Sequence, residues 1–391
     1  MPESRRRFLK SVAALPAAAS IPPLQGQATL RDVYKELGVR PLINAAGTYT
    51  YLSASLMPRP VVEAIESASR QYVNLNELQA AVGRKIAALI GCESALVTAG
   101  AASALTLATA ACIAGKDPAR IRRLPDTAGM KCEVLIPRGH RNGYDHAVRN
   151  AGARLVEVET AADADRAVSE RTAMLLYFNL HGPEGKIAVE EFAALGKKRG
   201  IPTLIDAAAD IPPVENYSRF LKMGYDLAAF SGGKVLRGPQ CTGMLLGRRD
   251  LIEAAAANNS PQTDSVGRTN KVGKEEMVGL WAALDHFLRQ DPEARWKEWE
   301  RRCASIAAQV ATIPGVKAEP FVPAINNAVP HLKVTWPAGV APAEAQKRLR
   351  DGEPRIEVRA LLADGLEIGV FMLEPGEDEV VGRRLREVLA K

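Results

Sequence analysis

The sequence has few cysteines and no pair of them in a CxxC arrangement. Its five cysteines are widely spaced along 391 residues and odd in number, so they favour neither a zinc site nor a disulfide framework. Buried free thiols are the expected state of these side chains. We therefore expect no metal site.

A strong excess of charge of one sign is also missing. The formal net charge is +6 at pH 7, and half of it comes from Arg5, Arg6, Arg7 and Lys10 set against Glu3. The rest of the chain has no basic stripe with interleaved aromatic residues. We therefore expect that this protein does not bind nucleic acid.

No apolar run at the N-terminus is long enough to cross a bilayer. Residues 11–21 are mildly apolar, about half of the roughly 20 residues that a span needs. They follow residues 4–10, SRRRFLK, which match the twin-arginine export pattern, and small residues suited to cleavage occur near Ala19 and Ala28. We predict that residues 1–28 are a signal peptide, with a basic tail as the alternative. The folded protein would then use the twin-arginine translocase and be periplasmic, without stable membrane insertion.

The remaining chain alternates short apolar runs with helix-compatible segments. This pattern predicts an α/β fold with a mostly parallel sheet covered on both faces. The length predicts a large domain, residues 29–285, and a smaller α+β C-terminal domain, residues 286–391. The predicted strands of the large domain are residues 95–98, 134–136, 155–158, 173–178, 203–206, 227–230 and 244–246. The smaller domain is expected to contain strands at residues 331–336, 356–360 and 366–371 and a closing helix at residues 378–389.

Two polar residues follow predicted strands where ligands bind in such sheets. Asp206 ends the run Thr203-Leu204-Ile205, and a carboxylate there is costly to bury unless it meets a cation such as a protonated pyridine nitrogen. Lys234 follows a strand within Ser231-Gly232-Gly233-Lys234, where burial would lower its pKa and glycines let a ligand approach the backbone. Taken singly, an Asp at the end of a strand is more often a helix cap or turn residue, and a Lys at a Gly-rich turn is more often a loop lysine.

Two earlier segments complete a pattern of four. Gly100, Ala101 and Ala102 begin an Ala-rich helix directly after a strand, where backbone N–H groups can hold a phosphate and Ser231 can donate to it. His140 follows the strand at residues 134–136, where an aromatic ring would stack on a pyridine face. Phosphate helix, stacking residue, Asp and Ser-x-x-Lys is the order of a pyridoxal-phosphate (PLP) fold. The sequence therefore predicts a PLP enzyme of fold type I, the aspartate aminotransferase-like fold.

The chain also resembles a known family along nearly its whole length after the leader. It is similar to the selenocysteine synthase-like proteins, L-seryl-tRNA(Sec) selenium transferase relatives, and more so to their D-glucosaminate-6-phosphate ammonia-lyase-like branch. The resemblance is carried by LGVRPLINAAGT at residues 37–48, NELQ at 76–79, VTAGAA at 97–102, HRNGYD at 140–145, and SGGK at 231–234 followed by GPQ at 238–240.

The resemblance implies a homodimer or higher oligomer with active sites at the subunit interface. It makes Lys234 the Schiff-base lysine, Asp206 the partner of the pyridine nitrogen, and Ser231 with residues 100–102 the phosphate site. Selenium transfer is not expected, because export would separate the protein from tRNA. An exported relative is expected to act on an unphosphorylated small molecule.

The predicted activity is that of a PLP lyase acting on an amino acid or amino sugar acid. Lys234 would remove the α-proton and a β-substituent would leave, as in a dehydratase or ammonia-lyase. Aldol cleavage, racemisation, transamination and oxygen-dependent oxidation stay open with the same cofactor. An acyl-enzyme hydrolase using Ser231-x-x-Lys234 is a remote alternative, since glycines follow the serine and no partner motif is present. A noncatalytic ligand-binding protein is a further alternative.

Residues that contact the substrate are the least specified by the sequence. Asn44 and Thr48 are candidates because they precede the large domain, and Arg359 is a candidate for binding a carboxylate. Arg268 and Lys271 are candidates for reaching a phosphate bound to a neighbouring subunit, with ordinary solvated charge as the alternative.

Overall fold

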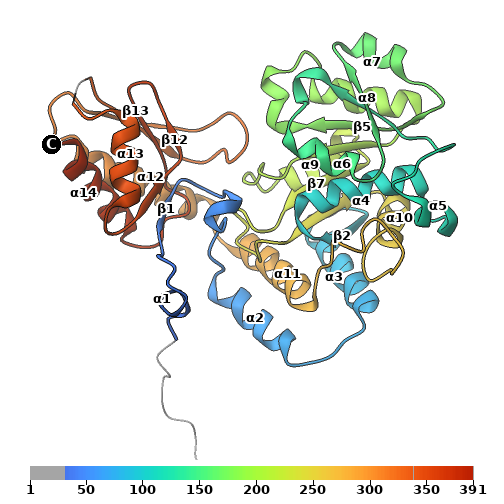
Figure 1. The fold of residues 1–391 in the computed structure, drawn as a ribbon, viewed down its shortest axis with the longest axis horizontal. Coiled ribbons are helices and arrows are strands. Elements are labelled where there is room, and N and C mark those ends of the chain that lie inside the picture. The colour runs from blue at the N-terminus through green and yellow to red at the C-terminus, as the bar shows by residue number, and fades with distance from the viewer. Residues whose placement is uncertain (1–30, 338, 391) are drawn as a thin grey trace, which may run out of the picture. The chain divides into compact units, whose positions relative to one another are not determined.

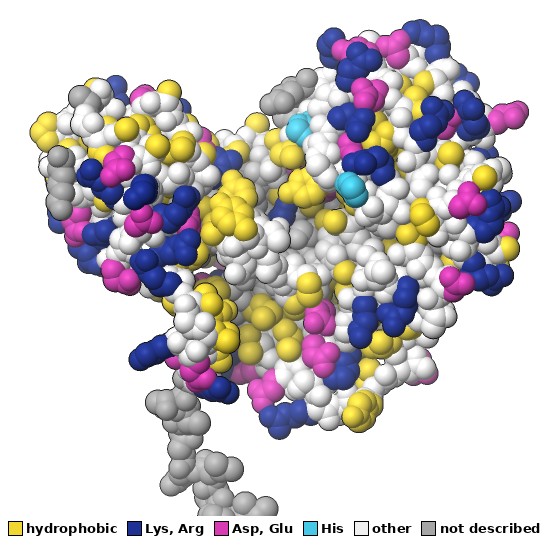
Figure 2. All heavy atoms as spheres, in the orientation of Figure 1, with side chains coloured by type: hydrophobic (Ala, Val, Ile, Leu, Met, Phe, Trp, Pro, Cys, Tyr) yellow, Lys and Arg dark blue, Asp and Glu magenta, His cyan; other side chains and the backbone are white. Residues whose placement is uncertain are grey.

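The computed structural model describes residues 31–337 and 339–390, so the predicted signal peptide lies outside the described residues. Among the helices of these residues, none combines the length and the apolar character that crossing a membrane requires. On the face shown in Figure 2, basic and acidic side chains are intermixed.

The chain divides into two compact units, residues 1–41 and residues 42–391. The described part of the first unit contains a short helix, α1 (Val33–Glu36). The Asp32 side chain caps this helix by accepting a hydrogen bond from the Lys35 backbone N–H. All other elements belong to the second unit.

The second unit is built on a seven-stranded sheet with the order β2-β8-β7-β6-β5-β3-β4 (Figure 1). Only β8 runs against the other strands. The seven predicted apolar runs form these seven strands, and the α/β fold is confirmed. The strands are β2 (Ser94–Thr98), β3 (Glu133–Pro137), β4 (Arg154–Val158), β5 (Thr172–Phe178), β6 (Thr203–Asp206), β7 (Leu227–Ser231) and β8 (Gly243–Gly247).

Helices cover both faces of this sheet, because side chains along each strand alternate between two cores. In β5, Leu175 and Tyr177 enter one core, whereas Met174 and Leu176 enter the other. The first core receives side chains from α3 (Leu75–Ile90), α7 (Ala161–Ala167), α8 (Val189–Arg199) and α9 (Asn216–Met223). The second receives them from α4 (Gly100–Ala114), α6 (His146–Arg149) and α10 (Arg249–Ala257), and α5 (Pro118–Arg123) packs in a third cluster beside α4.

Two helices outside the sheet pack along each other. They are α2 (Arg59–Ser69) and α11 (Lys274–Arg289). Close packing is possible because Gly279 of α11 has no side chain: a Cβ there would lie 2.9 Å from the side chain of Ile65. The 3₁₀ turn η1 (Thr50–Leu52) precedes α2.

Helix α12 (Pro292–Val310) follows α11, and Asp291 caps its start. The domain boundary predicted at residue 286 lies within α11, and the division into two domains there stays a prediction. A four-stranded sheet with the order β12-β13-β10-β9 packs with α12. The remaining elements are β9 (Lys317–Phe321), β10 (His331–Thr335), α13 (Pro342–Asp351), β11 (Ile356–Val358), β12 (Ala360–Leu361), β13 (Gly365–Gly369) and α14 (Glu377–Leu389).

The segment before the large domain contributes a strand to the smaller one. Strand β1 (Ile43–Ala45) pairs in parallel with β11, so residues predicted to belong to the large domain join the C-terminal part of the chain. The predicted strand at residues 356–360 is divided into β11 and β12 at Arg359. Pairing across more than 300 residues leaves no local signal in the sequence.

Candidate active site

Three predicted site segments lie at the carboxyl edge of the sheet. Thr98 at the end of β2 pairs with Gly243, which pairs with Ser231 at the end of β7. One strand further along, Asp206 at the end of β6 pairs with Ala229. Since β8 runs in the opposite direction, its first residue lies at the edge where its neighbours end. The phosphate helix, Ser231 and Asp206 therefore lie along one edge, as expected for this fold.

Gly243 allows the start of α4 to cross the sheet edge. A Cβ at this position would lie 2.4 Å from the carbonyl carbon of Gly100 and 2.6 Å from the nitrogen of Ala101. The missing side chain brings the first N–H groups of α4 toward the end of β7, where Ser231 lies. Glycine at residue 243 is thus required by close approach of two backbones.

The first turn of α4 has the properties of an anion site. Gly100 has a φ of +78°, and Ala99 supplies no side-chain cap to the helix. Ser103 is 4% exposed, and its hydroxyl oxygen has no hydrogen-bond partner among the described residues. Unpaired N–H groups, the helix dipole and a buried unpaired hydroxyl together fit a phosphate group.

Asp206 has a buried carboxyl group that forms no ion pair within the described residues. Its Oδ1 accepts one hydrogen bond, from the Ala208 backbone N–H at 2.9 Å. Burial raises the pKa of Asp206 to about 6; the hydrogen bond and the charge of Lys234 oppose this rise, and the charge of Asp210 adds to it. A bound cation would remove this cost, so Asp206 fits a protonated pyridine nitrogen.

Lys234 is carried by a tightly closed loop. The Gly232 N–H donates to the Thr242 carbonyl at 2.8 Å, and the Gly238 N–H donates to the Gly232 carbonyl at 2.9 Å. A Cβ on Gly233 would lie 2.5 Å from the Cα of Gln240, so this loop has no room for a side chain there. Burial lowers the pKa of Lys234, and the charges of Asp206 and Asp210 act against that shift. Such an amine suits covalent binding of an aldehyde.

Segments distant in the sequence hold the loop that carries Lys234. These contacts were not predicted from the sequence. The Ser55 hydroxyl donates to the Gly233 carbonyl at 2.7 Å. The Arg237 guanidinium donates to the Leu56 carbonyl at 2.5 Å and to Glu374 at 2.7 Å. These contacts fix the backbone on both sides of Lys234.

A second buried carboxylate lies near Lys234 and was also missed. Asp210 is 5% exposed, and its Oδ2 accepts a hydrogen bond from Asn179 Nδ2 at 3.0 Å. Burial raises the pKa of Asp210, and its charge acts on Lys234 and Asp206. The sequence offered one indication of this part of the site, because Asn179 is a polar residue directly after the buried run at residues 173–178.

His140 lies inside the protein. Its ring is fully buried and packs edge-on against Tyr177, with centroids 4.3 Å apart. Nδ1 accepts a hydrogen bond from the Phe178 N–H at 3.3 Å, and burial together with the charge of His181 lowers the pKa of His140 to about 4. The imidazole is therefore neutral at pH 7. The stacking of His140 on a cofactor stays a prediction.

The predicted substrate residues are mostly engaged elsewhere. Asn44 closes its own turn, accepting from the Gly47 N–H at 2.9 Å and donating to the Gly47 carbonyl at 3.0 Å. Arg359 pairs with Glu367 and lies over the Phe321 ring, 6.0 Å from its centroid. No signal in the sequence indicated these local partners of Asn44 and Arg359, and substrate binding by the two residues stays a prediction.

For four other candidates the structure gives the exposure of the side chain. Thr48 is buried, and Ser231 is partly buried at the sheet edge beside Gly243. Arg268 and Lys271 are exposed on the connection between α10 and α11. They stay predictions. No cluster of three or more metal-ligating side chains occurs in the described ranges.

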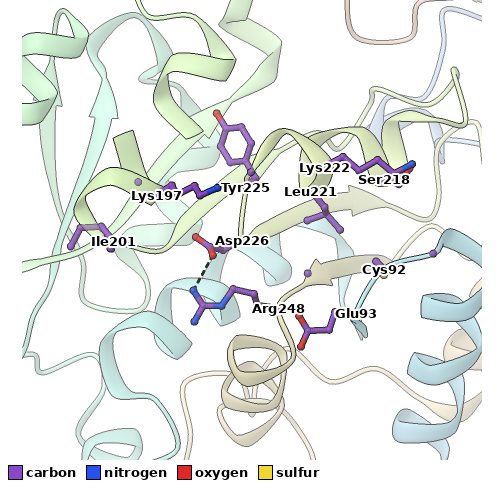
Figure 3. Close-up of a pocket in the computed structure, with 15 residues that line it drawn as sticks. Cys92, Glu93, Lys197, Ile201, Ser218, Leu221, Lys222, Tyr225, Asp226 and Arg248 are labelled. Carbon is purple, nitrogen blue, oxygen red and sulfur yellow. Dashed lines mark hydrogen bonds and ion pairs between the residues drawn. The ribbon is translucent and has the colours of Figure 1, made fainter. Parts of the chain in front are cut away.

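The pocket drawn in Figure 3 lies at the opposite edge of the sheet. It has a volume of about 600 Å³ and is lined by residues that precede β2 and β7 and follow β8. Its Asp226 pairs with Arg248 at 2.9 Å and accepts from the Thr203 N–H at 2.8 Å. These are contacts that hold strand ends together, and no predicted site residue lies there.

Gly243→Ala should weaken cofactor binding. The added methyl group would displace the start of α4, a clash that costs about 1–3 kcal/mol, or roughly tenfold or more in affinity. Titration of cofactor-free protein with PLP measures the effect. Gly139→Ala is the matched control, because a Cβ at Gly139 meets nothing within 4 Å. Equal affinity in the two variants would contradict the role of Gly243.

Comparison with known proteins agrees with this geometry. A sequence model described as L-seryl-tRNA selenium transferase matches residues 42–298. The 5'-C-glycyluridine monooxygenase-decarboxylase of a Streptomyces species is 32% identical, covering 91% of this chain and 92% of the relative. The D-glucosaminate-6-phosphate ammonia lyase of Salmonella typhimurium is 30% identical, covering 91% and 98%. A solved structure of D-glucosaminate-6-phosphate ammonia-lyase superposes with a TM-score of 0.82 at 28% identity, covering 92% of this chain and 99% of that one.

Proposed function

Because this chain belongs to the L-seryl-tRNA selenium transferase family of PLP-dependent enzymes, we propose that it is a lyase acting on an amino acid or amino sugar acid. The observation that carries the proposal is a pair of ionisable groups at the sheet edge. Asp206 is a largely buried carboxyl group with a raised pKa, and Lys234 is a largely buried amine with a lowered pKa. The open N-terminus of α4 supplies the phosphate site between them and β2.

When bound, PLP supplies an electron sink for the α-carbon of an attached amine. Lys234 Nζ would hold the cofactor and would also be placed to accept the α-proton, a role that the lowered pKa of this amine favours. Asp206 would hold the proton on the pyridine nitrogen. The N–H groups of α4 and the hydroxyls of Ser103 and Ser231 would hold the phosphate, and Arg237 keeps the lysine loop in place.

A second candidate function is oxygen-dependent decarboxylation of an amino acid. It is favoured by the Streptomyces relative, which is named a monooxygenase-decarboxylase and is similar over 91% of this chain. The lyase and the decarboxylase would use the same residues around the cofactor. The two functions differ in which bond of the substrate breaks. Oxygen consumption is the observable that differs.

A substrate screen tests the two candidates together. Purified PLP-loaded protein is incubated with amino acids and amino sugar acids, and ammonia, 2-keto acid, carbon dioxide and oxygen are measured. Ammonia and keto acid without oxygen uptake support the lyase. Carbon dioxide release with oxygen uptake supports the alternative. Absence of turnover with every substrate counts against both.

A homodimer is part of the proposal. Large hydrophobic side chains are exposed along residues 49–73, next to the segment that holds the lysine loop through Ser55 and Leu56. An exposed apolar patch of this kind favours an interface. The exposed side chains are Tyr49, Tyr51, Leu56, Met57, Val62, Tyr72 and Val73.

Charged substitutions in this segment should shift the oligomer toward monomer. Val62 is 45% exposed and Tyr72 fully exposed, so Val62→Asp with Tyr72→Asp should leave the fold intact while placing charges in the interface. Light scattering after size exclusion measures the mass. Val322→Asp, at a residue 47% exposed in another part of the chain, is the control. An unchanged dimer in the double variant would remove residues 49–73 from the interface.

Export of the folded protein completes the proposal. It is supported by the order of residues 4–10 and the short apolar run that follows. Replacing Arg5 and Arg6 by Lys should leave folded, PLP-loaded protein in the cytoplasm, because the described fold does not use the leader. Fractionation with cofactor absorbance in each compartment is the measurement. Continued export of this variant would contradict the signal.

A further inference from the structure

A cavity of about 170 Å³ borders the loop that carries Lys234. Three consecutive residues of this loop line it, Val235, Leu236 and Arg237. Most of the remaining wall comes from the end of α11, the first half of α12 and the segment that follows β13. None of the residues predicted to bind PLP lines it, so the cavity is separate from the phosphate site and from Asp206.

Much of the wall of this cavity is apolar and aromatic. The Phe287, Trp299 and Phe371 side chains are each 5% exposed and line it together with Val235 and Leu236. A cavity of this volume can hold a molecule about as large as a benzene ring, since an engineered cavity of about 150 Å³ binds benzene. The wall therefore suits a compact apolar body.

Three arginine side chains add positive charge to the wall. Arg302 Nε donates to Glu298 at 2.9 Å, and Arg237 donates to Glu374 at 2.7 Å. Each of these two cations therefore has a carboxylate partner. The third arginine is Arg295, which forms no ion pair with an acidic side chain of the described residues.

Arg295 is held in place but keeps an unused donor. Its guanidinium lies over the Phe287 ring, 4.0 Å from the centroid, and its Nη1 donates to Gln290 Oε1 at 3.0 Å. Its Nε is buried and has no hydrogen-bond partner within residues 31–337 and 339–390. A buried donor without a partner is costly, and native proteins rarely keep one without a ligand or water. Because a guanidinium binds a carboxylate through paired N–H groups, a carboxylate is the group that fits this open position.

The cavity shares a strained residue with the Lys234 loop. Arg237 has a φ of +58°, a left-handed conformation that residues other than glycine rarely adopt. Its N–H donates to the Lys234 carbonyl at 2.9 Å, and its side chain is bound to the Leu56 carbonyl and to Glu374. Such a conformation persists only where the surrounding structure holds it. A molecule that packs against this part of the loop would therefore stabilise the turn that begins at Lys234.

We propose that this cavity is an effector site for a small carboxylate with a compact apolar body, and that its occupation stabilises the Lys234 loop. The carboxylate accepts from Arg295, and the apolar body packs against Trp299 and Leu236. A neutral molecule would leave Arg295 without a partner, and a bare inorganic anion would leave the apolar wall unfilled. The inference goes beyond the proposed function, because it does not depend on which reaction Lys234 carries out.

Titration of the PLP-loaded protein tests the site. Benzoate has both the carboxylate and the apolar body, benzyl alcohol lacks the charge, and inorganic phosphate lacks the apolar body. We expect calorimetry to detect benzoate binding, with benzyl alcohol and phosphate both at least about tenfold weaker. Absence of benzoate binding would overturn the proposal, and so would binding of either other compound as tight as that of benzoate.

Variants of Arg295 locate the bound carboxylate. Arg295→Met removes the charge and should weaken benzoate binding at least about tenfold, whereas Arg295→Lys keeps the charge and should weaken it less. Arg384→Met is the matched control, because Arg384 Nε is also buried without a partner in the described chain, but this residue pairs with Glu387 on α14. Unchanged benzoate binding in Arg295→Met would place the carboxylate elsewhere and reject the site.

The affinity for PLP measures the coupling to the Lys234 loop. Cofactor-free protein is titrated with PLP in the presence and absence of saturating benzoate, and we expect benzoate to tighten PLP binding at least about fivefold. By linkage, benzoate should bind more tightly to the PLP-loaded protein than to the cofactor-free protein by the same factor. An equal or weaker affinity for PLP in the presence of benzoate would overturn the effector role.

Discussion

Lys234→Ala is expected to abolish covalent attachment of the cofactor. In the wild-type protein, borohydride should fix PLP to the chain and remove its visible absorbance, whereas the variant should release all PLP on denaturation. Activity should fall by about two to four orders of magnitude, since the variant loses the amine that accepts the α-proton. Mass spectrometry of the reduced protein and steady-state kinetics measure both effects.

Lys274→Ala is the control for this experiment. Lys274 is also partly buried, but it donates to the Ala68 carbonyl and pairs with Glu275 at the start of α11. The Lys274→Ala variant should therefore retain the covalently attached cofactor. Fixation of PLP in Lys234→Ala at the wild-type level would assign the attachment to another lysine and reject the site.

Asp206→Asn is expected to keep the cofactor and lose most of the activity. The amide is nearly isosteric but neutral, so it cannot keep the pyridine nitrogen protonated. A loss of about two to three orders of magnitude in kcat is expected for removing such a preorganised electrostatic partner. Activity within a few-fold of wild type would remove Asp206 from this role.

The same variant should stabilise the protein when PLP is absent. Burial raises the pKa of Asp206 from 3.8 to about 6, so the folded cofactor-free state must ionise an unfavourably buried group as the pH rises. The stability that the protonated form contributes is present below pH 4 and is lost as the pH rises through about 6. At pH 8 the ionisation of Asp206 therefore lowers the free energy of unfolding of the wild type by on the order of 2–3 kcal/mol. The Asp206→Asn variant does not lose this stability.

Denaturation of cofactor-free protein at pH 5 and pH 8 measures this difference. The wild type should be less stable than Asp206→Asn at pH 8, and the gap should narrow at pH 5. Adding PLP should reverse the order at pH 8, because the carboxylate then meets a cation. If the stability of the cofactor-free wild type increased relative to that of Asp206→Asn as the pH rises, burial would not be the cause of the raised pKa of Asp206.

Much of the fold follows from local patterns in the sequence. Strands buried on both faces are mostly apolar, so the strands at residues 173–178 and 203–206 could be predicted without knowledge of their neighbours in the sheet. The start of α4 is marked by small residues after a strand, and Lys234 by the glycines that its tight loop requires. Binding of PLP needs a carboxylate and a lysine at the ends of particular strands. Asp206 and Lys234 could therefore be proposed from their residue types and their order along the chain.

The tertiary structure alone decided which side chains are free to act. Asn44 and Arg359 look available in the sequence, but a turn and Glu367 occupy them. His140 follows the right strand, yet packing against Tyr177 buries its ring.

Long-range contacts explain the other residues that sequence reasoning missed. Ser55 reaches Gly233 across 178 positions, and Arg237 reaches Glu374 across 137. Hydrophobic periodicity encodes the type of an element because it is set by neighbours along the chain. Hydrogen-bond partners are set by which elements pack together. For this protein the sequence determined the seven strands of the large sheet and suggested Asp206 and Lys234 as site residues, and the fold determined which side chains surround them.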